Sequence, residues 1–160
     1  QSYSKTFGLK IGIIRSANIY GPYDYNIKRI VPETIISALK GKKLYIRSSG
    51  KMRRDYVFVE DVCKAYYSVY SKLRNSNKEL LIYNLGSKYN YSTLEFIKII
   101  YKVLKIKPNF EIQNLSKKEI KNKRLNYKRI RNELKWDSTT DIRIGLKKTI
   151  SWYKKNIRLF

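Results

Sequence analysis

The sequence predicts an α/β fold, and three observations carry the prediction. Short Ile- and Leu-rich runs of strand type occur at residues 10–15 and 80–85. Apolar residues recur with helical spacing over residues 94–104. Residues 2–7 have the character of a helix tail that leads directly into the first strand. A helix followed at once by an apolar strand indicates an α/β unit entered midway.

Gly and Pro residues divide the first half of the chain into short elements. Gly8 is placed to end the first helix, because glycine readily adopts the left-handed conformation found there. Residues 18–24 are predicted to form a loop, which Gly21-Pro22 punctuates. The next predicted elements are a helix over residues 33–40, with Pro32 in its first turn and Gly41 after its end, and a strand at residues 43–47.

Capping residues mark the later helices. Residues 54–59 alternate between charged and apolar side chains as a strand does, and Glu60-Asp61 can cap a helix over residues 62–74. Ser92 or Thr93 can cap the helix over residues 94–104. The remaining predicted elements are an extended piece at residues 110–112, an exposed basic segment at 114–123, and helices at 127–134 and 145–155.

The charge of the chain is strongly one-sided. Its 36 Lys and Arg stand against 12 Asp and Glu, a formal net charge of +24. Such a charge points first to a nucleic-acid partner, because Lys and Arg neutralise phosphates. Lys, Ile, Tyr and Asn are all abundant, however, and all have A/T-rich codons, so biased composition is the favoured explanation. The basic run at residues 117–131 is interpreted as a solvated face, with a nucleic-acid patch as the sharper alternative.

Residue counts exclude several kinds of site. At 42% hydrophobic residues the chain can bury a core, and no apolar run approaches the roughly 18 residues that span a bilayer. The chain has no His and one cysteine, Cys63, which excludes an internal disulfide, a His/Cys metal site and catalysis by an internal His. Cys63 is expected to be a small buried hydrophobe, and a reducing, cytoplasmic location is favoured.

Three polar clusters stand out, and the first and third lie at strand ends, where open α/β sheets bind ligands. The amide of Asn18 suits a phosphate or a sugar hydroxyl, and it equally suits organising a turn. Arg54 can hold a diphosphate bidentately while Asp55 holds the guanidinium, with an ordinary surface ion pair as the alternative. Asn84 lies near the end of the strand candidate at residues 80–85, where a turn without a ligand is the alternative.

In this order the clusters resemble the carboxyl-terminal half of extended short-chain dehydrogenase/reductases, and most closely the NAD-dependent nucleotide-sugar epimerases and 4,6-dehydratases. The motifs are Arg-x-x-Asn-x-Tyr-Gly-Pro at residues 15–22, Arg-Ile-Val-Pro at 29–32, Gly-x-x-x-Arg-Asp-Tyr-Val-x-Val-x-Asp at 50–61, and a closing pattern at 134–136 and 145–153. Residues 18–24 and 46–50 look most like CDP-glucose 4,6-dehydratases. The resemblance covers essentially the whole chain.

The resemblance implies a fold and a division of the chain. The fold would be the C-terminal part of a Rossmann-type parallel sheet plus a small mixed α/β substrate-binding domain. Residues 1–160 would be the substrate-binding portion, with residues 1–25 and parts of 50–75 belonging to the Rossmann core.

The resemblance also implies roles for individual residues. Substrate-binding residues would be Asn18 at the sugar or its diphosphate, Arg29 over the nucleotide, Arg54 on the diphosphate, Asn84 near it, and Ile46 and Arg47 at the base. Tyr20, Gly21 and Pro22 would shape the loop beside the nicotinamide of NAD, and Asp55 and Asp61 would support the site.

Two features of the resembled family are absent from the sequence. These are the glycine-rich turn that cradles NAD and the catalytic Tyr-x-x-x-Lys, which the resemblance places before residue 1. Tyr101 and Lys105 match the bare spacing, but Tyr101 belongs to the apolar stripe of its helix. The chain is therefore expected to be part of a longer enzyme, to bind no metal, and to leave most of NAD binding to an N-terminal half.

The expected function is binding of a nucleotide-diphosphate sugar for an NAD-dependent 4,6-dehydratase or epimerase of cell-surface polysaccharide biosynthesis. The isolated chain is expected to be inactive, and the full-length form to be a homodimer without membrane contact. Two alternatives stay open. One is a basic nucleic-acid-binding module, and the other is a non-catalytic remnant that folds poorly because its sheet exposes an unpaired edge.

Overall fold

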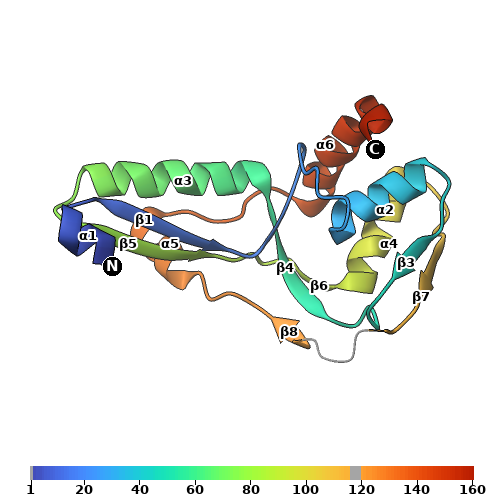
Figure 1. Cartoon of the computed structure of the whole chain (residues 1–160), viewed down its shortest axis with the longest axis horizontal. Coiled ribbons are helices and arrows are strands. Elements are labelled where there is room, and N and C mark those ends of the chain that lie inside the picture. The colour runs from blue at the N-terminus through green and yellow to red at the C-terminus, as the bar shows by residue number, and fades with distance from the viewer. Residues whose placement is uncertain (1, 116–119) are drawn as a thin grey trace.

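The computed structural model describes residues 2–115 and 120–160, and over them the chain alternates helices and strands (Figure 1). The elements are α1 (Ser2–Phe7), β1 (Ile11–Ser16), β2 (Asn18–Tyr20), α2 (Ile30–Leu39), β3 (Leu44–Ile46), β4 (Arg53–Phe58), α3 (Val59–Arg74), β5 (Leu80–Leu85), β6 (Asn90–Ser92), α4 (Thr93–Leu104), β7 (Phe110–Ile112), β8 (Asn122–Lys123), α5 (Lys128–Leu134), α6 (Ile142–Lys155) and a short 3-10 helix (Ile157–Leu159).

The central feature is the extended segment at residues 11–20, which pairs with one strand in its first part and with another in its second. β1 runs parallel to β5, with Ile11 opposite Leu80 and Ser16 opposite Leu85. After Ala17 the chain continues as β2, which runs parallel to β4 with Asn18 opposite Tyr56. β4 also pairs with β6 and with β8, so it joins the β1–β5 end to the rest of the molecule.

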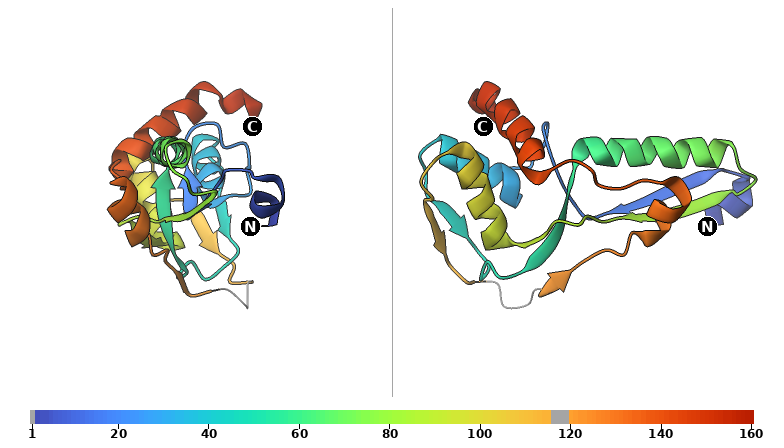
Figure 2. Two further views of the ribbon diagram at one scale, coloured as in Figure 1. Left: turned by 90° about the vertical axis from the view of Figure 1, so that its left-hand side faces the viewer. Right: turned by 180° about the vertical axis from the view of Figure 1, so that it is seen from behind.

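The β1–β5 pair is covered by helices, and the molecule is elongated in this direction (Figures 1 and 2). α3 lies along the strands and α5 packs against β5. The core here is built from one stripe of α3, alternate residues of β5, and side chains brought by α5 and the turn after it. Its buried members include Val62, Val69, Leu81, Tyr83, Ile130 and Trp136.

The opposite end is a helical layer over short strands. α2, α4 and α6 pack together there, and β3 pairs in parallel with β7 (Figure 1). α4 begins with a full capping box, because Ser92 accepts from the backbone of Glu95 while Glu95 accepts from the backbone of Ser92. Buried side chains of this end include Tyr20, Ile35, Leu44, Phe96, Ile100 and Leu146.

The structure confirms the predicted α/β class, the strand at Leu80–Leu85 and the Ser92 cap, and it corrects several boundaries. The predicted loop at residues 18–24 begins with strand β2, because Asn18–Tyr20 pair with β4. α2 starts at Ile30 and α6 at Ile142, each before the predicted first residue. α3 starts at Val59, so Asp61 lies within its first turn and is no cap.

Of the further expectations, one is wrong, one is confirmed, and one falls partly outside the described residues. Cys63 is exposed on α3, because the buried stripe of that helix passes through Val62 and Ala65 instead. The segment at 114–123 is exposed at all its described residues, as expected, and it also contributes strand β8, which pairs with β4. Lys117 and Lys118 of the basic run lie outside the described residues. Trp136 is buried.

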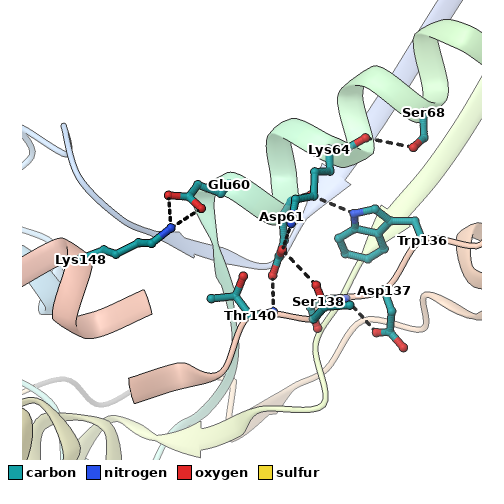
Figure 3. Close-up of polar contacts among 10 residues, drawn as sticks. Glu60, Asp61, Lys64, Ser68, Trp136, Asp137, Ser138, Thr140 and Lys148 are labelled. Atoms are coloured by element: carbon teal, nitrogen blue, oxygen red, sulfur yellow. Dashed lines mark hydrogen bonds and ion pairs between the residues drawn. The ribbon is translucent and has the colours of Figure 1, made fainter. Parts of the chain in front are cut away.

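Asp61 joins the start of α3 to the chain that leads into α6 (Figure 3). Asp61 is only 1% exposed, and its carboxylate accepts a hydrogen bond from the Thr140 amide at 2.9 Å and another from Lys64 Nζ at 3.3 Å. Its carbonyl oxygen accepts from the Trp136 indole at 2.8 Å. One residue therefore anchors a segment more than seventy positions away, and with it α6, which packs against α2 and α4.

Replacing Asp61 should weaken the whole fold. Asp61→Ala leaves the half-buried Thr140 amide without its acceptor, which should lower the free energy of unfolding by about 2–4 kcal/mol. The neighbouring Glu60 pairs with Lys148 at 2.7 Å but is half exposed, so Glu60→Ala should cost less than about 1 kcal/mol. Urea unfolding of both variants measures the difference. Equal losses would contradict the anchoring role.

Candidate functional site

A cavity of about 420 Å³ lies where β1 passes into β2. Its wall holds Ser16 and Asn18 from the strands, Asp24 and Arg29 from the following loop, and Tyr56 from β4. Asn18 reaches this position because β2 runs parallel to β4 and places it opposite Tyr56. The predicted residues Asn18 and Arg29 are therefore brought together at one cavity beyond the end of a parallel strand, where α/β sheets bind ligands.

The loop that carries Arg29 is held by local hydrogen bonds. Asp24 accepts from the amide of Asn26, and Asn26 accepts from the amide of Lys28, each at 3.1 Å. The hydroxyl of Tyr153 on α6 donates to the carbonyl of Asp24. Arg29 pairs with the Asp24 carboxylate at 3.4 Å but keeps 59% of its side chain exposed. Its guanidinium is thus oriented by the loop and still open to an anion.

Tyr56 supplies a neutral hydroxyl to the cavity. The residue is 2% exposed, and its ring stacks on Phe96 at a centroid distance of 3.7 Å. Burial raises the pKa of Tyr56 to about 12, although the positive charge of Arg54 works in the opposite direction. At neutral pH the group is therefore a hydrogen-bond donor and acceptor without charge.

Two adjacent arginines on β4 have different tasks. Each of the three guanidinium nitrogens of Arg53 makes a hydrogen bond: Nε and Nη2 donate to Asn90, and Nη1 donates to Glu95. Arg54 uses only Nη1, which donates to the carbonyls of Arg53 and Ile120. Among residues 2–115 and 120–160, no acceptor engages its other guanidinium nitrogens. Arg54 can therefore offer an edge of its guanidinium to a phosphate.

The expected support of Arg54 by Asp55 is wrong. The Asp55 carboxylate is 2% exposed and accepts from the Asn90 amide group at 2.8 Å and from the backbone amide of Leu125 at 2.9 Å. No hydrogen bond or ion pair joins it to Arg54 among the described residues, because both of its oxygens are engaged by Asn90 and Leu125. Asp55 thereby fixes the segment after β8 against the strand and shapes the site indirectly.

A smaller space links Arg54 to the main cavity. It measures about 20 Å³ and is lined by Ser16, Asn18, Arg54 and Lys123, together with Asp55. Ser16 and Asn18 line both spaces. The two arginines predicted to hold the substrate, Arg29 and Arg54, therefore lie on either side of the same two strand residues.

Asn84 lies on β5, opposite Arg15 of β1. Its amide donates to the carbonyl of Asn126 at 3.3 Å, which ties the strand end to the segment before α5. Next to this contact is an open hollow of about 440 Å³ that Arg124, Asn126 and Lys128 help to line. Asn84 is thus placed beside a basic surface, but it lines neither of the two spaces around Asn18.

Ile46 ends β3 and Arg47 follows it, apart from these spaces. Ile46 is 2% exposed and belongs to the core, so its side chain is closed to a ligand, and its carbonyl accepts from the Gln113 amide at 2.8 Å. Arg47 pairs with Glu33 of α2 at 3.7 Å and remains 61% exposed. Burial raises the pKa of Glu33, while Arg47 opposes the shift.

Tyr20, Gly21 and Pro22 line a hollow of about 210 Å³ with Val59. The Tyr20 ring is 2% exposed and packs on Phe58 and Phe96, and burial raises its pKa, so the residue presents backbone rather than a reactive hydroxyl. Gly21 is needed here, because a Cβ would overlap the Val59 side chain. These residues fit one wall of a nicotinamide site, but they include no phosphate-binding turn.

Sequence reasoning missed several residues that line the spaces. No role was predicted for Ser16, Asp24, Tyr56 or Lys123. Tyr56 belongs to the motif at residues 50–61, but its place at the cavity depends on its register with Asn18, and that of Lys123 depends on the pairing of β8 with β4. No helix of the described residues is long and apolar enough to cross a membrane.

A sequence model of the NAD dependent epimerase/dehydratase family matches residues 1–86. Among similar curated proteins, dTDP-glucose 4,6-dehydratase of Haemophilus influenzae is 32% identical over 168 residues, which cover 98% of this chain and 48% of that protein. A trifunctional UDP-glucose 4,6-dehydratase of Arabidopsis thaliana is 29% identical over 157 residues, covering 97% of this chain and 23% of that protein.

The fold is similar to that of solved enzymes. The dTDP-glucose 4,6-dehydratase from Bacillus anthracis, solved in complex with NAD, superposes with a TM-score of 0.84 at 28% identity. The match covers 99% of this chain and 49% of that one. The chain thus spans about half the length of these dTDP-glucose dehydratases. The resemblance seen in the motifs is confirmed for the family and the fold, and the nucleic-acid alternative gains no support. The likeness to CDP-glucose enzymes stays a prediction.

Tyr56 should make stability fall at high pH. Because its pKa rises from 10.0 to about 12 on folding, its contribution is complete below pH 10 and is lost as the pH climbs toward 12. Urea unfolding from about pH 8 to pH 12 should therefore show a steeper decline for the wild type than for Tyr56→Phe. Tyr67→Phe removes the same hydroxyl from the surface and is the matched control. Parallel curves for the wild type and Tyr56→Phe would refute the assignment.

Proposed function

Because the chain belongs to the NAD dependent epimerase/dehydratase family, we propose that it forms the nucleotide-sugar-binding part of an NAD-dependent 4,6-dehydratase or epimerase. The observation that carries the proposal is the single cavity at the β1–β2 passage, to which Asn18, Arg29 and Tyr56 all contribute. Similar proteins named for dTDP- and UDP-glucose support a nucleoside diphosphate sugar as the ligand.

In this proposal each polar residue binds or orients the ligand. Arg54 pairs with the diphosphate through the guanidinium edge that the protein leaves open, and Arg29 supplies a second positive charge across the cavity. Asn18 bonds the diphosphate or the sugar, and Asn84 adds a polar group near the strand ends. Arg47 contributes to base recognition, and the buried Ile46 supports its position from the core.

NAD, when bound, supplies the acceptor for hydride from the sugar. Tyr20, Gly21 and Pro22 would face its nicotinamide, and the rest of the cofactor would be held outside residues 1–160. The candidate Tyr101–Lys105 pair does not serve as the catalytic pair, because Tyr101 is 1% exposed and its hydroxyl donates to the Asn109 carbonyl. The chain alone would bind substrate without turning it over.

The finer assignments follow the same proposal. Residues 1–25 and parts of 50–75 would belong to a Rossmann core, and the remainder to the substrate-binding part. A cytoplasmic location, a homodimer as the full-length form and a role in polysaccharide biosynthesis belong to the proposal as well.

Binding should depend on Arg54. UDP-glucose and dTDP-glucose should each bind the purified chain in titration calorimetry, and Arg54→Ala should weaken binding roughly 10- to 100-fold, because a charge-assisted contact is lost. Arg143→Ala removes the same charge from an exposed position on α6 and should leave the affinity within about twofold. Equal losses in both variants would reduce the effect to net charge.

The chain alone should not catalyse. Incubation of the purified chain with NAD and either nucleotide sugar should yield no 4-keto sugar, because neither the glycine-rich turn nor a catalytic Tyr-x-x-x-Lys lies in the sequence in a usable position. Detection of the 4-keto product by absorbance in alkali would sink this part of the proposal.

A further inference from the structure

One buried hydroxyl has no hydrogen bond. Among the described residues, Ser16 Oγ is the buried side-chain nitrogen or oxygen without a partner. Such atoms are rare in native proteins, because a buried hydroxyl has given up its bonds to water. The other buried serines and threonines of the chain do have partners: Thr34 and Thr149 donate to backbone carbonyls, and Ser87 and Ser138 bond each other.

The position of Ser16 is set by the strand and not by its side chain. It is the last residue of β1, and its backbone pairs with β5 opposite Leu85. Ser16 lines both the 420 Å³ cavity and the 20 Å³ space beside Arg54. The residue therefore lies on the wall that the two spaces share, and its unpartnered hydroxyl oxygen is shielded from solvent there.

The charges around this wall define the group that would complete it. Arg29 lines one space, and Arg54 and Lys123 line the other. The two carboxylates nearby are already engaged, Asp24 by Arg29 and Asp55 by Asn90 and Leu125. A ligand group that accepts from a hydroxyl and is attracted by flanking cations is a phosphate oxygen.

We propose that the Ser16 hydroxyl donates to the diphosphate of the bound nucleotide sugar, between Arg29 and Arg54. This inference rests on the proposed function and adds a positioning residue to it. Ser16 would act by orientation, since its short side chain keeps the hydroxyl close to the strand backbone, whereas the two long arginine side chains supply charge. In the unliganded chain the same hydroxyl contributes no bond.

A purely structural serine makes the opposite predictions. The 20 Å³ space is large enough for one water, which could bridge Ser16 to neighbouring polar groups. Removal of the hydroxyl would then lower the stability of the unliganded chain. If Ser16 instead waits for a ligand, removal of the unsatisfied hydroxyl should leave the melting temperature unchanged or raise it.

The test compares Ser16→Ala with the wild type, using UDP and UDP-glucose as probes. We expect Ser16→Ala to bind both probes roughly 5- to 10-fold more weakly, by the same factor, while its melting temperature without ligand is unchanged or higher. Ser151→Ala, an exposed serine on α6, should match the wild type in every measurement.

Each other outcome overturns a different statement. A loss confined to UDP-glucose assigns Ser16 to the sugar and overturns the diphosphate contact. Unchanged affinity for both probes, or a lower melting temperature without ligand, overturns the positioning role while the proposed function stands. A wild-type chain that binds neither probe overturns the proposed function itself, and the inference with it.

Discussion

The change of partner at Ala17 is the constraint on which the site depends. The chain pairs with β5 up to Ser16 and with β4 from Asn18 onward, so two strands that do not pair with each other are held by one neighbour. A cavity opens where the pairing changes, because neither partner covers the passage. Residues on either side of the change acquire their positions from backbone pairing and need no side-chain support of their own.

Side-chain support is provided instead by buried carboxylates at some distance. Asp55 holds the segment after β8 against β4, and Asp61 holds the segment before α6 against α3. Both are almost fully buried, and both accept from backbone amides, so removal of either would leave amide donors inside the protein without an acceptor. The family motif Arg-Asp-Tyr-Val-x-Val-x-Asp thus combines an arginine that has an open guanidinium edge with two residues that organise the surrounding chain.

The sequence predicted most of the helices and strands, because their apolar spacing and caps are local properties. It predicted Asn18 and Arg29 at one site through motifs, and the cavity contains both. It could not show that Arg53 is consumed by Asn90 and Glu95 while Arg54 stays open, since adjacent arginines look alike until strand partners are known. Nor could it place Cys63, whose exposure depends on a rotation of α3 by a single residue.

The parallel pairing of β1 with β5 has a consequence for the order of folding. The two strands are separated by β2, α2, β3, β4 and α3, so their ends meet only after a long loop closes. The contacts of Asp61 with Trp136 and Thr140 span 75 and 79 positions, so they too join parts of the chain that are distant in sequence. Contacts of such separation are costly in chain entropy and slow folding. The wall of the 420 Å³ cavity therefore forms only when these distant segments have come together, after the local helices. Ligand binding would then report completion of the fold rather than formation of those helices.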